Sequence, residues 1–218
     1  MGNALIRVLF WQACLLGGVV QADDPKIERL ALDNGLTVLL RPVAETQQVA
    51  TVLLYSIGSD HDPPGRCGMG HLMEHVYVTA AAGDTPAREV RQYTQLYPGG
   101  WNAQTGNRYT VVATVTAHKD LDRELADVAA RMGDLKITAE DLQREIPRLV
   151  QEVGNMFGGI PSLAVGNLAR ERLRPTPHGG RRGGLPDQVR QVTAEQLQKR
   201  WTRYYKPANA ILVVVGGF

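Results

Sequence analysis

The pentapeptide His71-Leu72-Met73-Glu74-His75 constrains the fold of this chain more than any other feature. On an α-helix, side chains three and four residues apart share one face, so His71, Glu74 and His75 are expected to project together. Two imidazoles one turn apart can hold a zinc ion, and the carboxylate between them can reach a water molecule that the ion activates. The spacing therefore predicts a helix with a metal-binding face, against the alternative of a chance match on a surface helix.

Size and composition place the chain among ordinary globular proteins. Its 218 residues are 44% hydrophobic and 21% charged, which suits a domain with a real core. The formal net charge is +2, and the lysines and arginines are scattered along the sequence. Because a nucleic-acid-binding surface needs a concentrated basic patch, we expect no nucleic-acid partner.

The first 22 residues have the layout of a secretory signal peptide. Arg7 supplies a positive charge, residues 8–20 form an apolar run, and residues 20–22 offer a cleavage site before the acidic pair Asp23-Asp24. The run is short for a transmembrane span, although an uncleaved N-terminal anchor is the alternative. We therefore expect residues 1–22 to be removed and the mature chain to be exported, either to the periplasm or outside the cell, without a membrane span.

Removal of the signal peptide would leave one of the two cysteines. Cys14 lies in the apolar run, and the remaining Cys67 cannot form an internal disulfide by itself. Cys67 does not share a helical offset with His75, so we expect a small buried residue near the start of the helix rather than a metal ligand. The exported protein must then hold itself together by packing, which a bound metal can aid.

Hydrophobic periodicity predicts a mixture of strands and helices. Asp33-Asn34-Gly35 marks a turn between two β-rich segments, which we expect to form a hairpin. Further strands are expected at residues 49–57, 109–117 and 211–215. Helices are expected from about 66–70 to 82, then at 86–96, 121–132, 139–157, 162–173 and 194–205, with a loop at 175–186. This order predicts an α+β fold: a two-layer sandwich with a mostly antiparallel or mixed sheet and helices packed on one face.

A third metal ligand must come from elsewhere, because a catalytic zinc site takes three protein ligands and leaves one position open. The helix expected after Thr138 offers Glu145 and Glu152, whose seven-residue separation puts both carboxylates on one face. Pro147 lies between them, and a proline inside a helix removes one hydrogen bond and bends the axis. We expect a kink that can tilt Glu145 away from the metal while leaving Glu152 in place.

Taken together, these motifs resemble the N-terminal domain of the pitrilysin/insulinase family of inverted zinc metallopeptidases, which includes the mitochondrial processing peptidase. Glu152 follows His75 after 76 intervening residues, a separation similar to that between the second histidine and the glutamate ligand of the family. Residues 99–110 resemble the segment in which the family's edge strand holds substrate backbone, and residues 204–216 resemble the close of that domain. The resemblance covers residues 27–218.

The resemblance implies zinc as the cofactor, with His71, His75 and Glu152 as its ligands. Glu74 would be the general base that takes a proton from the attacking water. The implied activity is that of a zinc metalloendopeptidase, which hydrolyses peptide bonds in unfolded peptides or small proteins.

The resemblance also implies roles for residues around the metal. Glu145 would orient one of the ligands, and Asn102 and Ala103 would pair with an extended peptide that adds to the sheet as a strand. From the residues alone, Glu145 can instead be a solvated helix charge, and Asn102 can be a turn residue.

The sequence departs from the family pattern in its length. Family members generally carry a second, similar domain that closes over the substrate, whereas this sequence stops where the first domain would stop. We therefore expect residues 23–218 to be a single catalytic half that works with a second domain-like subunit or as a homodimer. The alternative is a non-catalytic or weakly active zinc-binding half that serves assembly or peptide capture.

Overall fold

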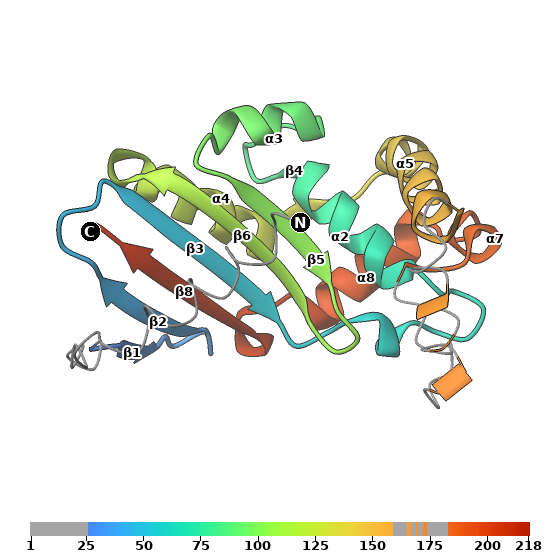
Figure 1. The fold of residues 1–218 in the computed structure, drawn as a ribbon, viewed down its shortest axis with the longest axis horizontal. Helices are drawn as coiled ribbons and strands as arrows, with labels where there is room; N and C mark the ends of the chain where they lie inside the picture. Colours follow the sequence, from blue (N-terminus) through green and yellow to red (C-terminus); the bar gives the residue numbers. More distant parts are fainter. Residues whose placement is uncertain (1–25, 159–164, 167–168, 170–171, 174–182) are drawn as a thin grey trace, which may run out of the picture.

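A six-stranded mixed sheet forms one layer of the fold (Figure 1). The computed structural model describes residues 26–158, 165–166, 169, 172–173 and 183–218. In their order across the sheet, the strands are β1 (Glu28–Ala31), β2 (Thr37–Pro42), β8 (Ala210–Gly216), β3 (Gln48–Tyr55), β6 (Thr110–Ala117) and β5 (Trp101–Thr105). Strands β2 and β8 run parallel, and the other neighbouring pairs are antiparallel. The C-terminal strand is therefore inserted between β2 and β3.

Strand β3 shows why one face of the sheet is buried. Val49, Thr51, Leu53 and Tyr55 are buried, whereas the residues between them are half-buried. Strands β6 and β8 have the same two-residue alternation. β-branched and aromatic residues with this period fit a pleated surface that is covered on one side. The helices cover this face, which confirms the predicted α+β fold with a mixed sheet.

The helical layer brings together segments that are far apart in the sequence. It includes α2 (Met69–Thr79), α3 (Val90–Leu96), α4 (Leu121–Gly133), α5 (Ala139–Gly158), α7 (Pro186–Val189) and α8 (Ala194–Tyr204). Helix α2 contacts α5, α8 and strand β5, while α4 lies behind the sheet in Figure 1 and contacts β6. A short second sheet pairs β4 (Ala81–Ala82) with β7 (Leu135–Lys136). This pairing holds the segment after α2 next to the segment that leads into α5.

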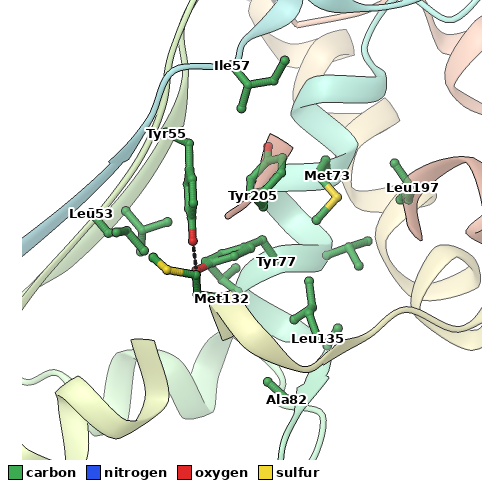
Figure 2. Packing of buried hydrophobic residues seen from close by; sticks show 14 of the residues in the cluster. Leu53, Tyr55, Ile57, Met73, Tyr77, Ala82, Met132, Leu135, Leu197 and Tyr205 are labelled. Carbon is green, nitrogen blue, oxygen red and sulfur yellow. Dashed lines mark hydrogen bonds between the residues drawn. The ribbon is translucent and has the colours of Figure 1, made fainter. Parts of the chain in front are cut away.

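The core between the sheet and α2 contains three packed tyrosines (Figure 2). Tyr55 from β3 and Tyr77 from α2 are buried, and their hydroxyl oxygens lie 3.0 Å apart in a hydrogen bond. The ring of Tyr205, at the end of α8, packs against both, with centroid distances of 4.7 and 5.7 Å. Leu72 and Met73 of α2 are fully buried as well. Burial of a large apolar side chain stabilises a fold by roughly 1.5–3 kcal/mol, so packing fixes the position of α2.

Two helix boundaries differ from the expectation. Helix α2 ends at Thr79 rather than at residue 82, because Arg131 of α4 donates hydrogen bonds to carbonyl groups at its end and the chain then becomes extended. Helix α3 begins at Val90 rather than at residue 86, because the backbones of Ala82 and Thr85 hydrogen-bond to each other in a tight turn. Residues 86–89 consequently lie outside the helix.

Several expectations concern residues outside the described ranges. The signal peptide at residues 1–22 lies there, and so do most of the helix expected at 162–173 and of the loop expected at 175–186. Within the ranges that are described, no helix combines the length and the apolar character that crossing a membrane requires.

Candidate metal centre

Helix α2 begins after Gly68, whose φ of +99° favours glycine. This N-cap has no side chain to accept hydrogen bonds from the first N–H groups of the helix, and Asp62 accepts them instead. Its two carboxylate oxygens accept from the N–H groups of Gly68 and Gly70, both at 2.9 Å. The buried Arg200 of α8 forms an ion pair with Asp62 at 3.1 Å. A buried ion pair thus fixes the first turn of the helix, directly before His71.

His71 and His75 lie one turn apart on α2 and face Glu152 of α5. Their ring centroids are 4.9 Å apart, with an angle of 85° between the ring planes. His71 Nε2 lies 3.6 Å from one carboxylate oxygen of Glu152, and His75 Nε2 lies 3.3 Å from the other. Each residue offers one donor atom, and these atoms all lie within 4.8 Å of one another. The structure therefore brings the three expected ligands together from two helices.

These three donors fit a zinc ion. Zinc bonds of about 2.0–2.2 Å in a tetrahedron place neighbouring donor atoms roughly 3.4 Å apart. His71 and His75 each have a Glu152 oxygen near this distance, Oε1 at 3.6 Å for His71 and Oε2 at 3.3 Å for His75. Two imidazoles and one carboxylate also form a donor set of catalytic zinc sites, in which a fourth position stays open. Calcium and magnesium prefer oxygen ligands, so the nitrogen donors favour zinc over either of them.

Glu145 lies on the metal-facing side of α5, although Pro147 is part of the same helix. Glu145 is completely buried, and its Oε2 lies 3.6 Å from Nδ1 of His75. Its Oε1 accepts hydrogen bonds from Arg144 and Arg148, both at 3.0 Å. Within the described residues Oε2 makes no hydrogen bond of normal length, which leaves it available to the His75 imidazole. The proline therefore does not tilt Glu145 away, and the alternative of a solvated charge is wrong.

The carboxylates around His75 change its protonation in the absence of a metal. Burial lowers the pKa of His75, but the contacts with Glu145 and Glu152 outweigh it and raise this pKa to about 9. The hydrogen bond to His75 lowers the pKa of Glu152 below its usual value. Burial opposes ionisation of Glu145, yet the contacts with His75 and Arg144 lower its pKa too. The metal-free centre is thus a protonated imidazole between two carboxylates.

Glu74 projects from the same face of α2 and is 7% exposed. Its Oε2 accepts a hydrogen bond from the hydroxyl of Thr105, the last residue of β5. Burial raises the pKa of Glu74, although His71 and the Thr105 hydroxyl act in the opposite direction. The raised pKa of Glu74 is closer to neutral pH, and a general base is most effective when its pKa lies near the working pH.

Strand β5 borders the centre and has an open edge. Within the described part of the chain it pairs only with β6, so its other side offers unpaired backbone N–H and C=O groups. Asn102 and Ala103 lie in this strand opposite Ala113 and Val112, so Asn102 is not a turn residue. A cavity of about 330 Å³ adjoins the strand, and its walls include Glu74, His75, Glu152, Trp101, Asn102 and Ala103. The predicted substrate residues and the predicted metal centre therefore line one space.

Three further residues support the centre without having been assigned a role from the sequence. Thr105 contacts Glu74, Asp62 anchors the start of α2, and the carbonyl oxygen of Gly183 lies 3.2 Å from Nδ1 of His71. Thr105 had a signal, because it lies within residues 99–110, the segment that resembles the substrate strand of the family. Gly183 had none, because 112 residues separate it from its partner and a backbone carbonyl is common to every residue type.

Comparison with known proteins finds relatives that match most of the chain. The family model described as insulinase, peptidase family M16, matches residues 37–172. The zinc protease PqqE of Helicobacter pylori is 28% identical over 208 residues, which cover 92% of this chain and 46% of that protein. Protease 3 of Escherichia coli is 21% identical over 198 residues, which cover 88% of this chain and 20% of that protein. The chain thus spans less than half the length of these relatives.

Solved structures share the fold. A protease from Helicobacter pylori matches with a TM-score of 0.78 and 26% identity, covering 89% of this chain and 47% of that one. The first half of the periplasmic protease PqqL from Escherichia coli gives a TM-score of 0.79 at 23% identity, covering 89% of this chain and 43% of that one. The family model matches more than half of the residues, and the His–His–Glu group lies where the resemblance implied its ligands. The chain belongs to the insulinase family of zinc proteases, peptidase family M16.

Proposed function

We propose that this protein is a zinc metalloendopeptidase that hydrolyses peptide bonds in unfolded peptides or small proteins. The observation that carries the proposal is the convergence of His71, His75 and Glu152 next to the buried carboxylate of Glu74. In this proposal the first three residues hold the zinc ion and Glu74 is the general base. Membership of the insulinase family supports the same roles.

The catalytic roles follow from the positions of the chain's own side chains. A bound zinc ion polarises the scissile carbonyl and lowers the pKa of a water molecule to about 7. Glu74 takes a proton from the attacking water, whose oxygen adds to the carbonyl carbon. The carbon–nitrogen bond then breaks, and Glu74 returns the proton to the leaving nitrogen. Thr105 holds the Glu74 carboxylate in place through its hydroxyl, and Glu145 orients His75 from the opposite side of the ring.

The substrate would bind as an additional strand along the open edge of β5. Backbone groups near Asn102 and Ala103 would pair with an extended peptide, and such pairing does not depend on the peptide's sequence. The adjoining cavity would receive a side chain of that peptide, with Val78 and Trp101 as its apolar wall. A folded segment presents no unpaired strand to β5, so unfolded or extended substrates are favoured.

Export and assembly are further parts of the proposal. Residues 1–22 would act as a signal peptide, and residues 23–218 would form the catalytic domain in the periplasm or outside the cell. PqqL, whose first half shares the fold, is described as periplasmic, which agrees with this location. A second domain-like subunit, or a second copy of the chain, would close over the substrate; in support, the Helicobacter pylori relative extends well beyond the 46% of its length that matches this chain.

The test combines metal analysis with a cleavage assay on the purified chain. We expect stoichiometric zinc, cleavage of an unfolded peptide, loss of cleavage with a chelator and recovery with added zinc. Glu74→Gln should lower cleavage by roughly 100- to 10,000-fold, because the general base is removed, while zinc content stays the same. Glu140→Gln, at an exposed position in the first turn of α5, is the matched control. Cleavage that persists unchanged in Glu74→Gln would overturn the assigned base.

A second candidate function is a non-catalytic or weakly active zinc-binding half that serves assembly or peptide capture. The observation that favours it is the coverage of 46% and 20% of the two curated relatives. This candidate predicts stoichiometric zinc and peptide binding with no turnover, either alone or with a partner chain. Zinc-dependent turnover by the purified chain would exclude it.

A further inference from the structure

The segment before α7 packs against the start of α2, although it lies far downstream in the sequence. The N–H of Leu185 donates to the carbonyl of Cys67 at 3.1 Å, and the N–H of Cys67 donates to the side-chain oxygen of Gln188 at 2.8 Å. The carbonyl oxygen of Gly183 then lies 3.2 Å from Nδ1 of His71. A carbonyl oxygen can only accept, so Nδ1 of His71 carries the proton in this contact.

Two glycines permit this close approach. Gly68 and Gly184 have φ angles of +99° and +100°, in the left-handed region that favours glycine. A Cβ atom on Gly184 would lie 2.6 Å from Cα of Gly68, and a Cβ atom on Gly68 would lie 2.7 Å from Cα of Gly184. Both distances are far below van der Waals contact. Any larger residue at either position must therefore move one of the two backbone segments away from the other.

The contact with Gly183 decides which nitrogen of His71 is available to a metal. A neutral imidazole has one N–H group and one nitrogen with a free lone pair. When Nδ1 donates to Gly183, the lone pair lies on Nε2, which is the nitrogen that faces Glu152 at 3.6 Å. In metal sites, the partner of the non-ligating nitrogen fixes both the tautomer and the orientation of the ring. His75 has the carboxylate of Glu145 in this place, so the two histidines are oriented by different groups.

We propose that the contact between Gly68 and Gly184 is a positioning device for His71. It holds the Gly183 carbonyl against Nδ1 and thereby presents Nε2 to the metal. The inference rests on the proposed zinc site, and it assigns a function to Gly183 and Gly184, which precede α7. It predicts that a displacement of this segment weakens zinc binding without removing any ligand.

The test uses Gly184→Ala with Gly65→Ala as a matched control. Both glycines have positive φ angles, but a Cβ atom on Gly65 would meet nothing within 4 Å, so only Gly184→Ala adds a clash. The zinc dissociation constant is measured by chelator competition, and folding is checked by thermal unfolding. We expect Gly184→Ala to bind zinc roughly tenfold or more weakly, as when other outer partners of metal ligands are lost, and Gly65→Ala to match the wild type. Equal zinc affinity in folded Gly184→Ala and wild type would overturn the inference.

A measurement on the metal-free protein separates this inference from the proposed function. Imidazole ¹⁵N NMR of the wild type, at a pH where His71 is neutral, should show the His71 proton on Nδ1; a proton on Nε2 would overturn the inference. If Gly184→Ala does not fold, Gln188→Ala replaces it, because it removes the side-chain tether to Cys67 without adding an atom. A smaller loss of zinc affinity is then expected, and no loss would count against the device. A wild type that binds no zinc but has the expected tautomer would refute the proposed function alone.

Discussion

Helices α2 and α5 both supply the metal centre, but different interactions hold them. Ten of the eleven residues of α2 are buried, and His75 is the exception. Helix α5 also packs Leu142, Leu149 and Val153 into the core. In addition it has a series of ion pairs near the centre, in which Arg144 pairs with Asp141 and Glu145, and Arg148 also pairs with Glu145. The side chain of Glu152 is 41% exposed.

This difference teaches how the centre is built. Packing and a buried ion pair fix α2, so its two histidines are placed whether or not a metal is bound. Packing also holds α5, but ion pairs fix Glu145, and the partly exposed Glu152 carboxylate has the paired imidazoles as its neighbours. We therefore expect substitutions that loosen α2 to reduce stability, and substitutions of Glu145 or Glu152 on α5 to reduce metal affinity.

The largest expected effect concerns the anchor of α2. Asp62→Ala removes the acceptor for the first N–H groups of the helix and leaves the buried Arg200 without its carboxylate. Loss of one partner of a buried ion pair costs about 3–5 kcal/mol, which denaturant unfolding would measure. The control is Asp187→Ala, because its ion pair with Arg190 is exposed and such pairs contribute little. An Asp62→Ala protein as stable as this control would contradict the account of α2.

The next effect concerns Glu145, on the metal-facing side of α5. Glu145→Gln keeps the size of the side chain but removes the charge that faces Nδ1 of His75. Partners of this kind contribute about 10- to 100-fold to metal affinity, so the zinc dissociation constant should rise by that factor. Glu140→Gln on the same helix should leave zinc binding unchanged. If both variants bind zinc like the wild type, Glu145 has no role in orienting His75.

An effect of similar size is expected where strand β5 meets α2. Thr105→Val removes the hydroxyl that donates to Glu74, and a hydrogen bond to a charged group contributes about 1.5–3 kcal/mol. Turnover should therefore fall roughly tenfold or more, while KM and zinc content stay the same. Thr105→Ser keeps the hydroxyl and should restore most of the rate. Equal rates for the valine and serine variants would show that the hydroxyl does not position the base.

The last effect is a gradual one with pH. The pKa of His75 is raised to about 9 from its usual 6.5, so zinc must displace a proton from it at neutral pH. Zinc affinity should thus rise about tenfold per pH unit from pH 7 and level off near pH 9. In the metal-free protein the sign is opposite: the protonated imidazole stabilises the fold below pH 6.5, and this contribution is lost as the pH rises to about 9. Glu145→Gln should flatten both dependences.

The sequence was informative where local pattern determines structure. The H-x-x-E-H spacing and the apolar residues around it predict α2, and the seven-residue spacing places Glu145 and Glu152 on one face of α5. The alternation along residues 49–57 predicts β3, which the structure confirms at Gln48–Tyr55. These features depend on neighbours within two helical turns or within one strand.

Features that depend on contacts between distant segments could not be predicted from local sequence pattern. The insertion of β8 between β2 and β3 depends on pairing between distant segments, and periodicity does not encode it. Helix α3 begins later than expected because the backbones of Ala82 and Thr85 pair in a turn directly before residue 86. Pro147 was expected to tilt Glu145 away from the metal, but ion pairs with Arg144 and Arg148 hold Glu145 on the metal-facing side. The role of Gly183 depends on its backbone carbonyl oxygen, which every residue type has, so no sequence pattern indicates it.

The most direct test of the central claim is zinc binding by the wild type and by Glu152→Ala. The claim is that His71, His75 and Glu152 hold one metal ion between α2 and α5. Metal analysis after dialysis should find stoichiometric zinc in the wild type and in the control Glu140→Ala, and no retained zinc in folded Glu152→Ala. Stoichiometric zinc in Glu152→Ala, with the same affinity as the wild type, would contradict the claim.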